Sequence, residues 1–391
     1  SFFFCDSVPD CPVHNILAAM LATWLALCIG VVTAVPQLQV NLDAAPEERW
    51  RSVAEYYKVE LPFMMQTWKD SLDARLGKQG QEAWLEAAIV DDDYRREIQG
   101  IVNTVDNPAV TPELLILWNH MYELHHPTFC SGILMAQPDG NVIHGRNMDY
   151  KFEFQVGGEQ LNWPNITFNV EFIKDGKPLF ISTQWPGQIG ISTAMRYDGW
   201  TFEQNTRFTN DQAANLAAMQ TGRGQAHALL ARKVMETVPD FERAVKTIYN
   251  SNLMAPQFFI MAGAKPWEGA VLTVDRNGQH LPDTPEVQRL HKRTGSWHIV
   301  QTNDDLNKPP TDLRLPMANA LLEEHKQWEV NVNFAWEQMR HSPMFNGGTV
   351  FTTVYVPSRN SQVTRLPFEA APVEKQLSFL RRSPSSLERQ R

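Results

Sequence analysis

Residues 130–149 read CSGILMAQPDGNVIHGRNMD, and this stretch decides the fold. Two apolar runs flank an Asp-Gly pair, which is a strong signal for a β-hairpin. With Asp139-Gly140 as a two-residue loop, Cys130 lies opposite Asp149, and Arg146 lies near Gly132 or Ile133 on the same pair of strands. Directly opposed side chains lie about 4.5–5.5 Å apart at Cβ. The hairpin therefore predicts a carboxylate, and a guanidinium close by, beside a thiol.

Helix and strand patterns alternate in blocks outside this hairpin. Residues 36–129 are mostly helical in pattern, and Thr111 caps a helix expected over 111–124. Further helical patterns cover 211–249, interrupted at Gly222 and Gly224, and 313–339, broken at Pro316. Strand patterns fall at 166–173, 179–183, 258–262, 270–274, 298–301, 349–356 and 362–366. This order predicts one large α+β domain in which helices cover sheets.

The apolar stretch 56–68 has two interpretations. Its large side chains suit a helix buried in the core, or an exposed surface that contacts lipid; they are Leu61, Phe63, Met64, Met65 and Trp68.

Charge and composition exclude several functions. The 35 basic and 44 acidic residues give a formal net charge of −9 at pH 7, with no basic run, so nucleic acid is not an expected partner. Cysteines and histidines do not recur at metal-ligand spacing, and no glycine-rich phosphate loop is present. We expect neither a metal nor a cofactor.

The amino terminus has the pattern of a targeting segment. Residues 16–32 carry no charge, and cleavage after Ala34 would make residues 1–34 a signal peptide, with a membrane anchor as the alternative. Cleavage would remove Cys5, Cys11 and Cys28 and leave Cys130 as a single thiol, either a buried filler or a reactive group. The sequon at Asn165 fits a secretory route. The tail, residues 369–391, is expected to be flexible.

A thiol nucleophile needs activation, because the thiolate is the reactive form. His125, His126 and His144 are close to Cys130 in sequence, but we interpret all three as structural residues. The sequence thus offers no imidazole partner for the thiol.

The same residues carry a family resemblance. Residues 130–137 and 144–150, with the spacing from Cys130 to Arg146 and Asp149, resemble the start of the β-subunit in the family of acid ceramidase and N-acylethanolamine-hydrolysing acid amidase, within the wider choloylglycine hydrolase-like group of N-terminal nucleophile hydrolases. Further similar segments follow in the family's order at 41–50, 170–176, 255–263, 300–304, 312–314 and 349–354. The resemblance implies the N-terminal nucleophile hydrolase fold, in which two packed antiparallel sheets lie between helical layers (αββα), preceded by a helical α-subunit segment.

The resemblance also implies a self-processed enzyme. The precursor would cut itself between Phe129 and Cys130 into an α-subunit or propeptide segment, 35–129, and a catalytic β-subunit, 130–368, which stay together as a heterodimer. Cys130 would then carry a free α-amine, whose ordinary pKa of about 7.7–8.0 suits a proton shuttle.

The family's site residues map onto this chain one by one. Asp149 matches the residue that orients the α-amine, Arg146 a positive neighbour of the thiol, Asn303 the oxyanion-hole asparagine, and Arg314 a supporting residue. As bare sequence features these residues also have plainer interpretations. Asp149 and Arg146 would form a surface ion pair, Asn303 would be a turn residue, and Arg314 a solvated helix charge.

Three departures from the family pattern stand out. Ser131 and Gly132 follow the cysteine, where the family usually has Thr-Ser. Thr206-Arg207 stands where relatives carry Glu-Arg, which puts processing or the pH optimum in question. Asp304 replaces a tyrosine after Asn303.

The resemblance implies fatty acyl amides as substrates. N-acylethanolamines are favoured, with ceramide, an N-acyl amino acid, bile-acid conjugates or β-lactam amides as alternatives, and with a catalytically silent lipid-binding relative as the competing class. A lipid chain needs an apolar channel, for which we expect Met64, Met65, Trp68, Trp185 and Trp200 as lining or simply as core. A lysosomal or secreted location and contact with a membrane surface complete the expectation.

Overall fold

The structure is a computed structural model that describes residues 35–124, 129–207, 211–278 and 287–368. The described residues all belong to one compact unit. The predicted signal or anchor segment, His125 and His126, and the predicted tail at 369–391 lie outside the described residues. Within the described ranges, no helix is both long and apolar enough to cross a bilayer.

A five-stranded antiparallel sheet carries the predicted hairpin. Its strand order is β13-β2-β3-β14-β15. The strands are β2 (Phe129–Ala136), β3 (Val142–Asp149), β13 (His298–Gln301), β14 (Thr349–Val356) and β15 (Ser361–Arg365). Cys130 therefore lies in a central strand, with β13 on one side and β3 on the other.

A second sheet of eight strands faces the first. Its order is β1-β6-β7-β8-β9-β10-β11-β12. The strands are β1 (Gln37–Asn41), β6 (Phe168–Lys174), β7 (Lys177–Gln184), β8 (Thr193–Arg196), β9 (Thr201–Thr206), β10 (Gln257–Ala262), β11 (Gly269–Val274) and β12 (Val287–Arg289). Strand β1 pairs with β6 in parallel, whereas every other pairing in the sheet is antiparallel. The segment expected to be helical thus contributes one strand, which was not predicted.

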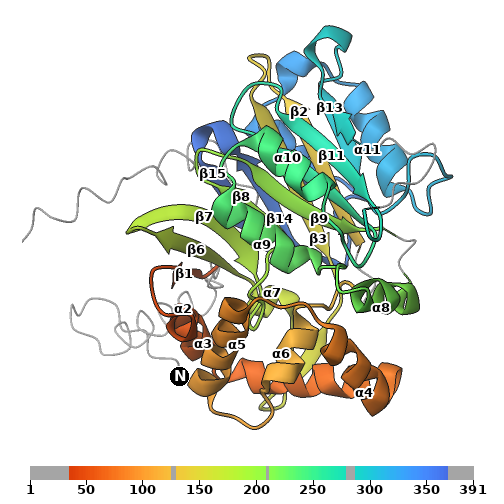
Figure 1. Ribbon diagram of the computed structural model, residues 1–391. Helices are drawn as coiled ribbons and strands as arrows, with labels where there is room; N and C mark the ends of the chain where they lie inside the picture. The colour runs from red at the N-terminus through yellow and green to blue at the C-terminus, as the bar shows by residue number, and fades with distance from the viewer. Residues whose placement is uncertain (1–34, 125–128, 208–210, 279–286, 369–391) are drawn as a thin grey trace, which may run out of the picture. The chain divides into compact units, whose positions relative to one another are not determined.

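Helices cover the outer faces of both sheets, so the predicted αββα layering of the α+β fold is confirmed (Figure 1). Helices α9 (His227–Thr237) and α10 (Phe241–Tyr249) lie on the eight-stranded sheet, and α11 (Arg314–Glu323) and α12 (Val332–Arg340) lie on the five-stranded sheet. Apolar side chains from both sheets fill the space between them; they include Leu134, Val142, Ile260 and Val271. Alternation along β2 puts Ile133 and Met135 on the other face, under α11 and α12.

The remaining helices gather mostly in the amino-terminal part of the unit. They are α2 (Pro46–Arg49), α3 (Arg51–Tyr56), α4 (Glu60–Ala87), α5 (Asp92–Val105) and α6 (Pro112–Trp118), with α7 (Trp163–Ile166) and α8 (Gln212–Gln220) following later. A short ribbon pairs β4 (Glu153–Val156) with β5 (Glu159–Asn162). Single 3₁₀ turns lie at Lys292–Thr294, Gln327–Glu329 and Pro357–Arg359. Helix α4 bends at Gly77, whose φ of 61° is a left-handed value that glycine tolerates.

The apolar stretch 56–68 belongs to the core. Met64, Met65 and Trp68 are fully buried, as the core interpretation predicts. Phe63 is the exception, because it is 44% exposed and lies near the exposed Tyr56 and Val59.

The predicted register of the central hairpin is wrong by one residue. Cys130 pairs with Met148, and Phe129 pairs with Asp149. The loop has three residues, because Gln137 N–H donates to Asn141 O at 2.8 Å and Gly140 adopts a φ of 90°. A two-residue loop would need an N–H from Pro138, which proline lacks. The one-residue shift moves Asp149 to the face opposite the thiol.

Other boundaries also differ from the sequence pattern. Helix α6 ends at Trp118 rather than at 124, although Thr111 caps it as predicted by accepting from Leu114 N. Pro316 does not break a helix, because it lies in the first turn of α11, where a missing N–H costs little. The break falls instead between α11 and α12. The interruption at Gly222 is confirmed, with a φ of 72°.

Candidate active site

The Cys130 side chain points into the space between the two sheets. It is fully buried, and its Sγ lies 3.7 Å from Met148 Sδ on the paired strand. Arg146, two residues along β3, shares this face and brings Nη2 to 3.9 Å from Cys130 Sγ. The predicted approach of a guanidinium to the thiol is therefore present in the fold, through Arg146 opposite Gly132.

Burial controls the acidity of this thiol. It raises the pKa of Cys130 to about 11, although the positive charge of Arg146 works in the opposite direction. With the chain intact, the sulfur is therefore a neutral thiol near neutral pH. A thiol in this state needs a base before it can attack a carbonyl.

A buried carboxylate on the facing sheet was not anticipated. Glu203 on β9 is fully buried, and its Oε2 lies 2.8 Å from His144 Nε2. His144 Nδ1 in turn lies 2.8 Å from Thr201 Oγ1, so both ring nitrogens have partners. Burial lowers the pKa of His144, and its bond to Glu203 works the other way. The alternation from Thr201 to Glu203, in a segment for which no strand was predicted, is the signal that could have placed Glu203 on the inner face.

The backbone of Cys130 is held by two polar side chains. Its N–H donates to Asn303 Oδ1 at 2.9 Å, and its carbonyl accepts from Arg314 Nη1 at 2.8 Å. Arg314 Nη2 also donates to Asn303 Oδ1, at 3.0 Å. Asn303 Nδ2 donates to Thr206 O at 2.7 Å, which fixes the orientation of this amide. Both side chains are buried, so the plainer interpretation of Arg314 as a solvated charge is wrong, whereas Asn303 does lie in a bend of the chain.

Asp149 lies on the other face of the hairpin, toward α11. Its two oxygens accept from Asn346 Nδ2 at 2.7 Å and from Thr349 Oγ1 at 2.8 Å. Its nearest ion partner is Arg314, with Nη1 4.0 Å from Oδ2, and not Arg146 as the plainer interpretation expected. Burial raises the pKa of Asp149 to about 6, against the effect of these donors and of Arg314.

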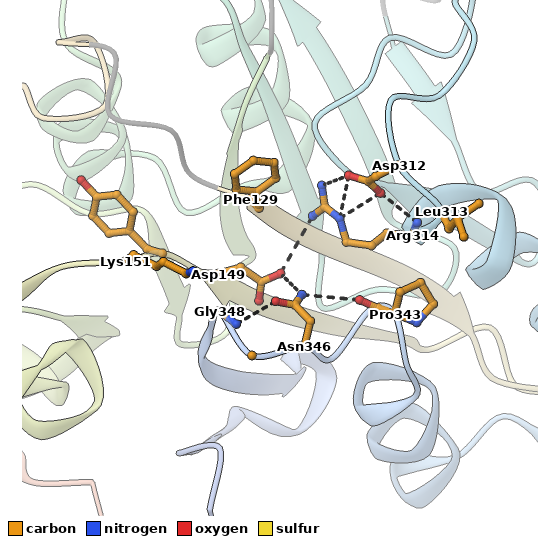
Figure 2. A pocket seen from close by; sticks show the side chains of 11 residues that line it. Phe129, Asp149, Lys151, Asp312, Leu313, Arg314, Pro343, Asn346 and Gly348 are labelled. Atoms are coloured by element: carbon orange, nitrogen blue, oxygen red, sulfur yellow. Dashed lines mark hydrogen bonds and ion pairs between the residues drawn. The ribbon is translucent and has the colours of Figure 1, made fainter.

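A cavity of about 810 Å³ opens beside Asp149 (Figure 2). It is lined by Phe129, Asp149, Tyr150, Lys151, Asp312, Leu313, Arg314, Pro343, Asn346, Gly347 and Gly348. Phe129 lies at the edge of this cavity and is 46% exposed. Arg314 Cζ lies 5.6 Å from the centre of the Phe129 ring. The Phe129–Cys130 peptide bond thus joins a residue at the cavity to a residue in the interior.

The expected lipid-lining residues do not border this cavity. Met64, Met65, Trp68, Trp185 and Trp200 are buried side chains of the main core, and Trp185 stacks on Trp163 at 3.8 Å. Their core interpretation is the one the structure supports.

Residues that depart from the family pattern at positions 206 and 304, together with Arg207, make contacts around Asn303 and the loop that follows it. Thr206 contributes its backbone carbonyl to Asn303. Arg207 is buried and pairs with Asp305 at 2.8 Å. Asp304 accepts from the backbone and hydroxyl of Thr311 and so holds the loop that leads to Arg314. Asn165, the acceptor residue of the predicted sequon, is exposed in α7, and its Oδ1 accepts from Asn162 N.

No group of three or more His, Cys, Asp and Glu side chains among the described residues is arranged to hold a metal ion. The polar side chains around Cys130 instead bind one another and the backbone. The arrangement can hold a thiol, a backbone nitrogen and a carboxylate in fixed positions within one hairpin, which is the equipment for acyl transfer to sulfur.

Comparison with known proteins supports the same chemistry. The chain is 30% identical over 349 residues to the N-acylethanolamine-hydrolyzing acid amidase of Mus musculus, covering 87% of this chain and 90% of the relative. The chain belongs to the family of N-acylethanolamine-hydrolysing acid amidase and acid ceramidase.

Other members of the family match at similar levels. The acid ceramidase of Homo sapiens is 27% identical over 349 residues, covering 82% of this chain and 83% of the ceramidase. Residues 33–83, which fall almost entirely in the segment expected to be the α-subunit, match the family described as the beta subunit of N-acylethanolamine-hydrolyzing acid amidase. A solved structure of the Caenorhabditis elegans N-acylethanolamine-hydrolyzing acid amidase ortholog superposes with a TM-score of 0.52 at 26% identity, covering 61% of this chain and 99% of that chain.

Family membership confirms the resemblance found in the sequence. It makes the chain an amidohydrolase of the N-terminal nucleophile type with an α+β fold, of the lipid amidase and ceramidase kind. The catalytic roles of five residues stay predictions; these residues are Cys130, Arg146, Asp149, Asn303 and Arg314.

Proposed function

We propose that this chain is a self-processing lipid amidase that hydrolyses fatty acyl amides through a Cys130 thioester. The observation that carries the proposal is the placement of the Cys130 backbone nitrogen, 2.9 Å from Asn303 Oδ1, beside a carbonyl held by Arg314. Cleavage at Phe129–Cys130 converts that nitrogen into an α-amine that is already held beside its own thiol.

The self-cleavage begins at the thiol. Cys130 Sγ attacks the Phe129 carbonyl carbon, the peptide C–N bond breaks, and the thiol proton passes to the leaving nitrogen, which becomes the new α-amine. Water then hydrolyses the Phe129 thioester. Phe129 lies at the cavity edge, which gives water access to that carbonyl. Residues 35–129 remain bound to residues 130–368 as an α/β heterodimer.

Hydrolysis of substrate repeats this chemistry on an external amide. The α-amine of Cys130 takes the thiol proton, Sγ attacks the acyl carbonyl, and the amine returns the proton to the leaving nitrogen. Arg146 favours the developing thiolate. Asn303 is the proposed donor to the tetrahedral oxyanion. Because its Nδ2 donates to Thr206 O in the intact chain, this role requires the amide to exchange that bond for the oxyanion.

N-acylethanolamines are the proposed substrates. The sequence is 30% identical to the mouse amidase that is named for them. The cavity beside Asp149 is bordered by Phe129, Leu313 and Pro343, apolar groups suited to an acyl chain. Ceramide is the second candidate, because acid ceramidases match at 25–27% identity over a similar length.

The location of the protein follows from this proposal. A lysosomal or secreted enzyme fits the predicted signal peptide and the exposed Asn165 as a glycosylation site. Contact with a membrane surface is supported by the exposed Tyr56, Val59 and Phe63, which are 56%, 63% and 44% exposed.

Incubation at acidic pH, followed by a denaturing gel and amino-terminal sequencing, tests the proposal. We expect two fragments divided before Cys130, with hydrolysis of a long-chain N-acylethanolamine, and neither in Cys130→Ala. An intact wild-type chain that binds lipid and hydrolyses neither acyl ethanolamide nor ceramide would identify the silent lipid-binding relative. Faster hydrolysis of an aromatic acyl amide than of a long-chain one would point to bile-acid conjugates or β-lactam amides.

A further inference from the structure

A second group of polar side chains lies behind Arg146, away from the cavity. Glu123 follows α6, His227 begins α9, and Ser192 directly precedes β8. His227 Nδ1 lies 2.7 Å from Glu123 Oε1, and His227 Nε2 lies 3.2 Å from Ser192 Oγ. Glu123 and His227 are each 1% exposed, so the carboxylate and the imidazole of this hydrogen-bonded group are shielded from water.

Arg146 connects this group to the Cys130 thiol by contacting both. The Ser192 carbonyl accepts from Arg146 Nη1 at 2.7 Å, and Arg146 Nη2 is the atom that lies 3.9 Å from Cys130 Sγ. A guanidinium is planar, so fixing Nη1 against a carbonyl also fixes the direction of Nη2. The position of Ser192 therefore determines how the positive charge faces the sulfur.

Ser192 is itself positioned by the start of α9. Ile191 N–H donates to Ala228 O at 3.0 Å, and a Cβ added to Gly190 would meet Ala228 Cβ at 2.7 Å. The two segments are in close contact, and the His227–Ser192 bond is the polar link between their side chains. A change in that bond acts on the strand that carries the Ser192 carbonyl.

The Glu123 carboxylate fixes the orientation of the His227 ring. Glu123 Oε1 accepts from both the backbone N–H and Nδ1 of His227. Nε2 is then the ring nitrogen that bonds with the Ser192 hydroxyl. The groups that face this pair are His120, Tyr122 and Arg146, and Ser192 is also a hydrogen-bond partner of the Tyr122 phenol.

We propose that His227, held by Glu123, is a positioning residue for the Cys130 thiol and acts through Ser192 and Arg146. The proposal rests on Cys130 being the nucleophile of the proposed function. Glu123 precedes the Phe129–Cys130 bond in the chain, whereas His227 and Ser192 follow it. The hydrogen bonds from Glu123 through His227 to Ser192 therefore join the two segments that cleavage would separate. The α-subunit segment thus helps to orient the Arg146 charge that faces the Cys130 thiol.

The test measures the thiol itself, without any substrate. In the full chain labelled with ¹³Cβ-cysteine, the Cys130 signal is assigned through Cys130→Ser, and its shift is followed from pH 6 to pH 10, with near-UV circular dichroism confirming the fold. Below the thiol pKa, the shift change is proportional to the thiolate fraction. We expect this change at pH 10 to fall by about threefold or more in His227→Gln and in Ser192→Ala, as a pKa rise of about half a unit requires.

Two matched variants separate positioning from general damage. Ser192→Thr keeps the hydroxyl and should titrate like the wild type. His325→Gln removes a histidine that also pairs with a glutamate, Glu329 at 3.3 Å, on an exposed site away from Arg146, and should change nothing. If His227→Gln fails to fold, Ser192→Ala decides alone, since it removes one oxygen from a partly exposed side chain.

The proposal would be overturned if Cys130 in folded Ser192→Ala titrated as it does in the wild type. It would also be overturned if His325→Gln reduced the shift change of Cys130 as much as His227→Gln does. Failure of the proposed function gives a different result. A chain that hydrolyses no acyl amide can still show the shifted thiol in His227→Gln and Ser192→Ala.

Discussion

The Glu203 carboxylate occupies the space that a side chain at position 132 would need. A Cβ added to Gly132 on β2 would meet Glu203 Oε2 at 2.6 Å and both other carboxyl atoms within 2.8 Å. The family usually carries a serine at this position, which a buried glutamate on the facing sheet does not permit. The departure at Gly132 and the buried Glu203 are therefore two halves of one local arrangement beside Arg146.

Replacing Gly132 with serine should destabilise the fold. Overpacking of a buried site costs about 1–3 kcal/mol, and chemical denaturation will measure this loss. Combining Gly132→Ser with Glu203→Ser should recover at least about 1 kcal/mol relative to the sum of the two single changes, because the residues share one space. Gly347→Ser is the control, since a Cβ there meets nothing within 4 Å. Additive single effects would show that the two positions are independent.

Arg314→Met should both destabilise the chain and prevent self-cleavage. The change removes the donors to Cys130 O and Asn303 Oδ1 and leaves Asp149 without its ion partner. Breaking a buried charged pair costs about 3–5 kcal/mol, measurable by urea unfolding, and a gel reports the cleavage. Arg289→Met provides the comparison, because the exposed pair with Glu242 contributes at most about 1 kcal/mol. Normal cleavage in folded Arg314→Met would contradict this role.

The stability of the fold should depend on pH through Asp149. Its pKa is about 6 in the folded chain, above the ordinary aspartate value of 3.8. The folded state thus binds this proton more tightly, so the contribution to stability is greatest below about pH 4 and is lost as pH rises to about 6, by at most about 3 kcal/mol. The difference in unfolding free energy between wild type and Asp149→Asn, measured from pH 4 to pH 7, should show this slope. A difference that stays constant across that range would rule the shift out.

Arg232→Met should release the amino-terminal segment after cleavage. Glu97 and Arg232 are both buried and joined by two hydrogen bonds, and they lie on opposite sides of Cys130 in sequence. Losing Arg232 leaves the Glu97 charge buried beside Arg49 alone, which strongly disfavours association. Size-exclusion chromatography of cleaved protein should show separated fragments. Lys233→Met, which removes the neighbouring exposed pair with Asp91, should leave the fragments together, and co-elution in both variants would refute the prediction.

The hairpin at residues 130–149 was predictable because its signals are local. Apolar runs on either side of Asp139-Gly140 identify two strands, and the spacing of Cys130, Arg146 and Asp149 identifies the family. The register was not predictable from the Asp-Gly signal alone, since Pro138 has no N–H and lengthens the loop. That single residue decides which face Asp149 occupies.

The sequence by itself determined the layered α+β fold, the thiol at the start of a strand, and an arginine nearby on the paired strand, because these follow from periodicity and short-range pairing. Tertiary structure alone decided the partners: Glu203 from the facing sheet beside Gly132, Arg314 on the Cys130 carbonyl, and the pair of Glu123 and His227 behind Arg146. These contacts join residues far apart in the chain. Their distances depend on how sheets and helices pack, and no local pattern records that packing.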